Sequence, residues 1–300
     1  MDAPIIYYHR YHRKLEPELI YGENALRWTY NHPAGRFTLE TVVKRNLFSR
    51  FYGWLMDRPS SRKRVKPFIR AYELDESEFA EPASSYRTFN DFFTRALKPE
   101  ARPIAADPGR ITFPADGRHL VVPKLDQDSF IFAKGRRFDL VELLGDEALA
   151  KQYAGGSLLI SRLCPTDYHR FHFPFGGTPG PSKLINGPLY SVSPIALRNN
   201  LSIFWQNKRS LTFLQTENAG RVALLEIGAT CVGSIVQTYQ PELAVQKGAE
   251  KGMFRFGGSC VITIFEPGRM IFDQDLVMNS ASGYELYARM GDGCGQISGW

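Results

Sequence analysis

The sequence lacks paired cysteines, a long apolar run and an apolar segment near its N-terminus. Its four cysteines, Cys164, Cys231, Cys260 and Cys294, are scattered without C-x-x-C spacing. This argues against a disulfide framework and a cysteine zinc site, and indicates free thiols in a reducing compartment. Residues 1–13 hold no apolar signal core, and no apolar run approaches the about 20 residues that span a bilayer. We therefore expect a soluble or peripheral protein.

The net charge of the chain indicates which kind of partner it could bind. The 300 residues carry a net charge of +6, and 43% are hydrophobic, which is enough for one sizeable core. A basic balance indicates an anionic partner: nucleic acid, a phosphorylated ligand or an anionic membrane surface. The basic and aromatic residues 7–13 contain no recognised nucleic-acid-binding module, so no nucleic acid is expected. His169 and His172 could bind a metal, but no cysteine or second His-Glu motif accompanies them, and we predict none.

The N-terminal part is predicted to be helical and basic. Residues 1–35 are expected to form an irregular arm with a short helix at 23–30. Within residues 38–56, apolar side chains recur near helical spacing with basic ones between them, and a cationic tract at 58–70 follows. One interpretation is a helix in a lipid interface, where clustered Lys and Arg contribute about 1 kcal/mol each. The other is an ordinary amphipathic helix packed on the domain with a solvated basic face.

Most of the remaining chain is predicted to be β-structure. From Ile111 onward, short apolar runs with β-branched residues are bounded by Gly, Pro and Asp, which favours strands. One helix is expected at 140–153, with Asp139 as its cap. Few helical crossovers are available, so the sheets should be largely antiparallel. The predicted strands include 120–122, 130–132, 157–160, 222–227, 231–236 and 261–265.

These patterns predict an α+β fold. Residues 1–103 would hold the arm and the amphipathic basic helices, including a short helix near Thr88. Prolines within 98–104 mark the passage into the second region. Residues 104–300 would form a β-rich catalytic domain.

One short segment, residues 254–260, carries the chemistry on which the function depends. Gly257 and Gly258 precede Ser259, and an apolar β-rich run follows. A glycine pair can adopt backbone conformations that residues with a Cβ resist. A serine hydroxyl beside such a peptide bond can attack it, so Ser259 could cut the chain at the carbonyl carbon of Gly258. Taken alone, the segment favours a Gly-Ser turn that leads into a strand, because such turns are common.

Further segments combine with this one. Residues 114–117 place Asp116 in a turn, residues 167–172 contain His169 and His172, and residues 228–235 are rich in small side chains. Together they resemble the phosphatidylserine decarboxylases, a family of pyruvoyl-dependent enzymes. The motifs occur in the family's order from about residue 85 onward, and the others that carry the resemblance are Ser191-Val192-Ser193-Pro194, Asn207-Lys208-Arg209, Lys251-Gly252 and Met290-Gly291-Asp292-Gly293.

The resemblance implies roles for particular residues. Ser259 would attack Gly258 and become a pyruvoyl group, which serves as an electron sink for decarboxylation. His172 would take the proton from Ser259, and Asp116 would orient His172 and stabilise its charge, as in a catalytic triad. His169 is the candidate acid that returns a proton after CO2 leaves.

The resemblance also implies partners. The expected reaction converts phosphatidylserine to phosphatidylethanolamine and CO2 on the cytoplasmic face of a membrane, which gives the basic residues 38–70 an anionic surface to bind. The small C-terminal fragment would remain with the large one as a subunit. Members of the family are usually homodimers.

The sequence departs from the family's pattern in two places. The processing motif is most often Leu-Gly-Ser-Thr, whereas here Gly257 and Cys260 flank the Gly-Ser pair, and Ser193 stands where Asn is frequent. The scissile pair is intact, so processing is expected. Two alternatives remain open: a pyruvoyl enzyme that decarboxylates a soluble amino acid, and a non-catalytic membrane-binding protein that is never cut.

Overall fold

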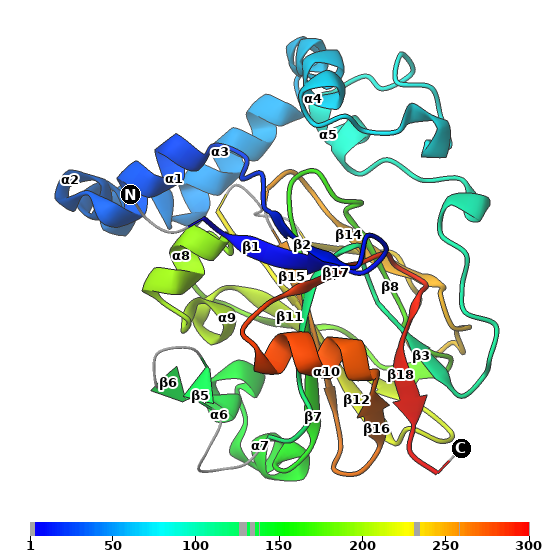
Figure 1. Ribbon diagram of the computed structural model, residues 1–300. Helices are drawn as coiled ribbons and strands as arrows, with labels where there is room; N and C mark the ends of the chain where they lie inside the picture. The colour runs from blue at the N-terminus through cyan, green and yellow to red at the C-terminus, as the bar shows by residue number, and fades with distance from the viewer. Residues whose placement is uncertain are drawn as a thin grey trace.

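The computed structural model describes residues 4–125, 131–132, 136–137, 139–230, 235–257 and 259–299. N-terminal helices are followed by mainly antiparallel sheets, which confirms the α+β class (Figure 1). Within the described ranges, no helix combines the length and apolar character needed to cross a bilayer. The α-helices are α1 Glu23–Asn31, α2 Pro33–Thr38, α3 Asn46–Met56, α4 Val65–Ala71, α5 Phe89–Phe93, α6 Leu140–Leu144, α7 Glu147–Tyr153, α8 Pro194–Asn199, α9 Ile203–Gln206 and α10 Gln274–Ala281.

The main sheet has the strand order β10-β11-β12-β15-β7-β4-β17-β1-β2, with β9 paired to β11. Its pairs are antiparallel except for β1 with β17. The strand that begins at the proposed cleavage site, β15, lies inside this sheet between β12 and β7. The strand bounds are β1 Ile6–His9, β2 Lys14–Pro17, β4 Gly117–Val122, β7 Ser157–Leu163, β9 Thr178–Pro179, β10 Lys183–Ile185, β11 Arg209–Gln215, β12 Arg221–Ile227, β15 Ser259–Phe265 and β17 Leu286–Ala288.

Smaller sheets flank the main one. The sheet β13-β14-β8 carries the segment that leads into the cleavage site, and β16-β18-β3 lies near the C-terminus. The pair β5-β6 covers only a few residues, and part of the strand expected at 231–236 falls outside the described residues. The remaining bounds are β3 Arg110–Thr112, β5 Ile131–Phe132, β6 Arg136–Arg137, β8 Arg170–His172, β13 Ile235–Gln237, β14 Glu250–Phe254, β16 Met270–Phe272 and β18 Gly293–Ile297.

The N-terminal arm is more regular than its sequence predicted. The helix expected at 23–30 is present as α1, but the residues before it form a β1–β2 hairpin rather than an irregular segment. Tyr8 lies opposite Leu286, so the hairpin extends the main sheet through β17. The local pattern did not reveal these strands because the partner strand lies near the other end of the chain.

The expected helices are present but interrupted. In the stretch 38–56, a π-helical turn over Leu39–Val43 ends where Arg45 adopts extended backbone, and α3 begins after it. In the stretch 140–153, Gly145 has a left-handed φ of 67° and divides α6 from α7. Asp139 caps α6 as predicted, with its carboxylate accepting the Glu142 N–H at 2.7 Å. Asp146 caps α7 in the same way.

An aromatic cluster joins the helical region to the cleavage segment. Phe89 and Phe93 of α5 pack against the ring of Phe256, with centroids 5.2 and 5.0 Å apart. Asn90, in the same helix, accepts the Phe256 N–H at 2.9 Å through its side-chain oxygen. The helix α5 therefore fixes the backbone three residues before Ser259.

Candidate active site

Ser259 is the first residue of β15 and is fully buried. It lies opposite Leu163 of β7, so strand pairing sets its position from the first residue onward. Its Oγ has no hydrogen-bond partner among the described residues. Buried hydroxyls are normally satisfied, so an unpaired one calls for a specific explanation. Gly257 has a φ of 134°, a conformation that favours glycine; Gly258 lies outside the described residues.

His169 lies beside the cleavage segment. Its ring centroid is 4.0 Å from that of Phe93, and the side chain is fully buried. Nδ1 donates to the Asp167 carbonyl at 2.9 Å, which leaves a lone pair on Nε2. Burial lowers the pKa of His169 to about 3, although the nearby Gly257 carbonyl opposes the shift. Among the described residues Nε2 has no hydrogen-bond partner, and the lowered pKa leaves the imidazole neutral with an available base nitrogen.

His172 ends strand β8 and has a similar arrangement. Its Nδ1 donates to the Gly248 carbonyl at 2.9 Å, and its buried Nε2 has no hydrogen-bond partner within the described ranges. Burial lowers the pKa of His172, while the charges of Glu250 and Asp116 oppose this. Both predicted histidines therefore present an unprotonated, unpaired Nε2.

Asp116 is placed differently from the triad arrangement that the resemblance implies. Its carboxylate accepts two hydrogen bonds from Arg102, Nε to Oδ1 at 2.8 Å and Nη2 to Oδ2 at 2.6 Å. It also accepts the Met290 N–H at 2.8 Å. Asp116 and His172 share no hydrogen bond here, because Nδ1 of His172 binds Gly248; they interact through charge.

A close backbone contact explains why the residue after Asp116 is glycine. Gly117 has a φ of 156°, and a Cβ there would lie 2.4 Å from the Arg162 carbonyl oxygen. Only glycine allows β4 to approach β7 this closely. The turn that presents Asp116 therefore depends on Gly117.

Sequence reasoning missed several charged residues around the site. Arg162 of β7 binds Glu18 of the N-terminal arm at 2.7 Å and Glu285 at 2.5 Å. Burial alone would raise the pKa of Glu18, but Arg162 outweighs it and lowers this pKa to about 2. Arg118 binds the Asp167 carboxylate at 2.7 Å, and the backbone carbonyl of Asp167 accepts the hydrogen bond from Nδ1 of His169. No local motif marks these residues, because their partners come from distant parts of the chain.

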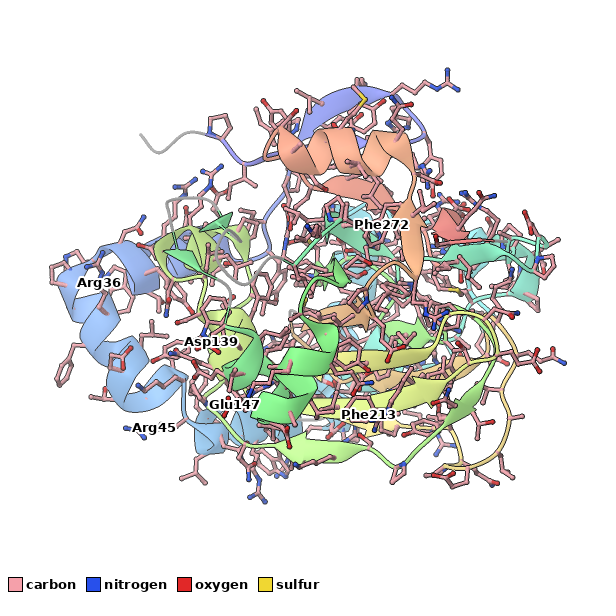
Figure 2. The ribbon with its side chains drawn as sticks, turned by 90° about the horizontal axis from the view of Figure 1, so that it is seen from below. Arg36, Arg45, Asp139, Glu147, Phe213 and Phe272 are labelled. Carbon is pink, nitrogen blue, oxygen red and sulfur yellow. The ribbon has the colours of Figure 1, made fainter. Side chains whose placement is uncertain are left out.

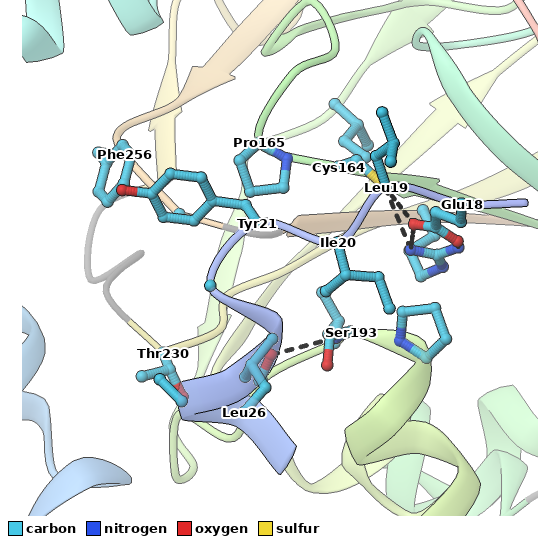
Figure 3. Close-up of a pocket in the computed structure, with 18 of the residues that line it drawn as sticks. Glu18, Leu19, Ile20, Tyr21, Leu26, Cys164, Pro165, Ser193, Thr230 and Phe256 are labelled. Atoms are coloured by element: carbon cyan, nitrogen blue, oxygen red, sulfur yellow. Dashed lines mark hydrogen bonds and ion pairs between the residues drawn. The ribbon is translucent and has the colours of Figure 1, made fainter. Parts of the chain in front are cut away.

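A cavity of about 240 Å³ borders the cleavage segment at Phe256 and Gly257 (Figure 3). Apolar and aromatic side chains of the N-terminal arm form one wall, and residues of the Ser191–Pro194 motif form another. Hydroxyl groups of Ser193 and Thr230 face it together with the ion pair of Glu18 and Arg162. Other lining residues include Leu19, Ile20, Tyr21, Leu26, Tyr52, Leu163, Cys164, Pro165, Val192 and Pro194.

These residues fit a pyruvoyl group at position 259. The Ser259 hydroxyl makes no hydrogen bond to any residue that the structure describes, so conversion would break none of these contacts. Strand pairing would hold the new terminus in place, and the cavity beside Gly257 provides room for a substrate. His169 and His172 are the described groups with free base nitrogens in this region.

Comparison with known proteins agrees with the site. The sequence profile of the family named phosphatidylserine decarboxylase matches residues 89–296. The phosphatidylserine decarboxylase proenzyme of Clostridium botulinum (strain Langeland) is 43% identical over 291 residues, which cover 97% of this chain and 99% of the relative. The proenzyme of Chlamydia pneumoniae is 43% identical over 290 residues, covering 97% and 96%. That of Desulfitobacterium hafniense (strain Y51) is 42% identical over 291 residues, covering 97% and 98%.

The comparisons first define a class, that of decarboxylases made as a precursor, since all three relatives are named proenzymes. The chain belongs to the phosphatidylserine decarboxylase family. This confirms the resemblance found in the sequence motifs.

Proposed function

We propose that this protein decarboxylates phosphatidylserine to phosphatidylethanolamine and CO2 after cutting itself between Gly258 and Ser259. The observation that carries the proposal is the buried hydroxyl of Ser259, which has no partner in the described part of the chain and lies at the start of an interior strand, directly after a glycine pair. Family membership supplies the reaction class.

Self-cleavage needs a base for the serine hydroxyl. His172 is assigned this role, with Nε2 accepting the proton while Gly248 holds Nδ1. Asp116 stabilises the resulting imidazolium through its charge, and Arg102 fixes that carboxylate. The Oγ of Ser259 attacks the Gly258 carbonyl carbon, the peptide C–N bond breaks, and the Ser259 nitrogen takes the proton held by His172, which leaves an ester. A base then removes the Ser259 α-proton, the Cβ–Oγ bond breaks, and its electron pair leaves with the Gly258 carboxylate. Water converts the remaining dehydroalanine to pyruvoyl and ammonia.

In the cut protein, the pyruvoyl group supplies an electron sink for the charge left when CO2 departs. The role of His169 follows from which of its ring nitrogens carries a proton. Because Nδ1–H is bound to Asp167 and the pKa is lowered by burial, Nε2 begins as a base. His169 must therefore collect a proton before it can protonate the α-carbon of the product. The apolar walls of the adjoining cavity would favour loss of the substrate carboxylate as neutral CO2.

The helical region offers a surface for the lipid bilayer. Phe37, Leu47 and Phe51 are 71%, 78% and 58% exposed, although each is a large apolar side chain. Arg36 lies on α2 next to Phe37, and Arg45 directly precedes α3; both arginines are exposed (Figure 2). Apolar side chains combined with cations suit an anionic membrane interface. We propose that this surface, within residues 1–103, binds the cytoplasmic face of a membrane and that residues 104–300 carry out the chemistry in a homodimer.

Purified protein and the Ser259→Ala variant test the function. Wild-type protein should yield two fragments by intact-mass analysis, the smaller beginning with a pyruvoyl group, whereas Ser259→Ala should remain one chain. Wild-type protein should release CO2 from phosphatidylserine liposomes, and the variant should not. CO2 released only from free amino acids would replace the lipid substrate with a soluble one. One uncut wild-type chain with an ordinary serine would support a non-catalytic membrane-binding protein.

A further inference from the structure

Asn90 is a buried amide that joins the end of helix α3 to the cleavage segment. It lies in helix α5 and is only 3% exposed. Its Oδ1 accepts the Phe256 N–H at 2.9 Å, and its Nδ2 donates to Oδ1 of Asp57, the residue that ends α3, at 2.9 Å. Nδ2 also lies 3.4 Å from the Gly53 carbonyl oxygen. Because one partner is a donor and the other an acceptor, these contacts fix the orientation of the amide.

Phe256, the residue that Asn90 holds, is fixed in two ways. Its ring packs against those of Phe89 and Phe93, and it stacks on Tyr52 of α3 with centroids 5.6 Å apart. The rings limit where the side chain lies. The hydrogen bond from the Phe256 N–H is directional, so it sets the orientation of the backbone. Asn90 therefore orients the chain just upstream of the proposed cut.

The chain downstream of the cut is held independently. Ser259 pairs with Leu163 at the start of β15, and the pairing extends along the whole strand. Only the glycine pair 257–258 lies between Phe256 and Ser259. Glycine has more backbone freedom than any other residue, so this pair has many accessible conformations unless both of its ends are fixed.

We propose that Asn90 is a positioning residue for self-cleavage. The inference rests on the proposed cut between Gly258 and Ser259. By holding the Phe256 N–H, Asn90 restricts the glycine pair to conformations in which the Ser259 Oγ reaches the Gly258 carbonyl carbon. Such a reaction requires the two atoms to lie about 3–3.5 Å apart and aligned. Asn90 takes no chemical step itself and acts through the backbone of Phe256.

Loss of the side-chain oxygen should slow the cut. In Asn90→Ala the buried Phe256 N–H loses its acceptor, and a buried donor without an acceptor is costly. The segment should relax until this N–H finds another partner, which moves the glycine pair relative to Ser259. Because a misplacement of about 1 Å can slow a reaction about a hundredfold, Asn90→Ala should cut about a hundredfold more slowly than wild type. Intact mass followed over time measures the rate.

Exchanging the two polar residues tests the contact itself. Asn90→Asp retains an acceptor for the Phe256 N–H but places a carboxylate against that of Asp57, which repels it. This variant should cut slowly. Adding Asp57→Asn supplies an amide donor opposite the new carboxylate and should restore most of the cutting rate. Asp57 also pairs with Arg255 at the surface, where the loss of an ion pair has little effect.

A matched control separates positioning from a general loss of stability. Thr216 is also buried, and its Oγ1 accepts the Ala219 N–H at 2.9 Å in the turn between β11 and β12. In a Ser259→Ala background, Thr216→Val and Asn90→Ala should both lower the thermal midpoint. With Ser259 present, Thr216→Val should cut at the wild-type rate. Once Asn90→Ala has finished cutting, its kcat for phosphatidylserine should match that of wild type, because strand pairing still holds β15.

Four results would overturn the inference. The first is cutting of Asn90→Ala at the wild-type rate, and the second is equally slow cutting by Thr216→Val at a similar thermal midpoint. The third is a folded Asn90→Asp/Asp57→Asn protein that cuts no faster than Asn90→Asp. The fourth is a low kcat of fully cut Asn90→Ala protein, which would indicate a general structural role. Failure of wild-type protein to cut would instead count against the proposed function itself.

Discussion

Lys251 and Glu226 form an ion pair in the interior, with Nζ 2.8 Å from Oε1. Gln237 bridges them: its carbonyl oxygen accepts from Lys251 at 3.0 Å and its amide donates to Glu226 Oε2 at 2.7 Å. Lys251 lies on β14, which leads into the cleavage segment, and Glu226 on β12 is paired with Val261 of β15. The ion pair therefore connects the strand that leads into the cleavage segment, β14, with a strand that pairs with β15, namely β12.

Removing the lysine alone should destabilise the protein strongly. Lys251→Met in a Ser259→Ala background should lower the free energy of unfolding by about 3–5 kcal/mol, because it leaves Glu226 buried without a counter-charge. Urea unfolding measures this loss. The double variant Lys251→Met/Glu226→Gln should recover a large part of it in a double-mutant cycle. A loss below about 1 kcal/mol for the single variant would contradict the importance of this pair.

The predicted catalytic residues should separate into two groups. His172→Ala and Asp116→Asn should give uncut chains, because they remove the base for Ser259 and the charge that supports it. His169→Ala should cut but release CO2 poorly. Intact-mass analysis followed by a CO2 assay distinguishes these outcomes. His12→Ala, on the exposed β1–β2 turn, serves as the control. An uncut His169→Ala chain would show that the histidine beside Gly257 is the processing base.

The apolar surface of α2 and α3 should be needed for membrane binding but not for cutting. Leu47→Ser/Phe51→Ser should weaken binding to anionic liposomes about a hundredfold, since each side chain contributes roughly 1.5 kcal/mol or more when buried. Liposome sedimentation measures binding, and intact mass reports cutting. Ile271→Ser is a matched control, because Ile271 is 61% exposed on β16. Unchanged sedimentation of the double variant would favour an ordinary solvated helix.

The protein should lose stability in acid because of two buried histidines. Burial lowers the pKa of both His119 and His169 to about 3. Between the ordinary histidine pKa near 6.5 and about 3, the unfolded chain binds protons that the folded chain does not. Their stability contribution is therefore complete above about pH 6.5 and falls with decreasing pH, by about 1.4 kcal/mol per pH unit for each group.

Urea unfolding of Ser259→Ala protein across this pH range measures the slope. The cleavage chemistry does not use His119. Replacing it with Gln should reduce the pH dependence of the free energy of unfolding by the contribution of about one titrating group. A slope that is the same with and without His119 would disagree with its buried neutral state.

Local sequence patterns predicted the elements that carry a local signal. The strands at 157–160 and 261–265 were found because short apolar runs mark them, and Asp139 was found because a cap acts on its own helix. Features that depend on distant partners were missed. The β1–β2 hairpin needs β17, and the ion pairs of Arg102 and Arg162 join segments far apart in the chain.

The candidate site divides in the same way. Asp116, His169, His172 and Ser259 were identified because family motifs contain them. Their hydrogen bonds were not predictable, because Gly248 holds His172 and Arg102 holds Asp116.

The interior place of β15 has a consequence for the life of the molecule. Once the proposed cut is made, β15 begins a separate polypeptide and lies between β12 and β7 of the other fragment. Refolding after denaturation then becomes a second-order reaction between two chains, whereas the first folding was a single-chain event. Heat-treated mature protein should therefore regain its activity poorly and in a concentration-dependent way, and its working lifetime is set by how slowly it unfolds.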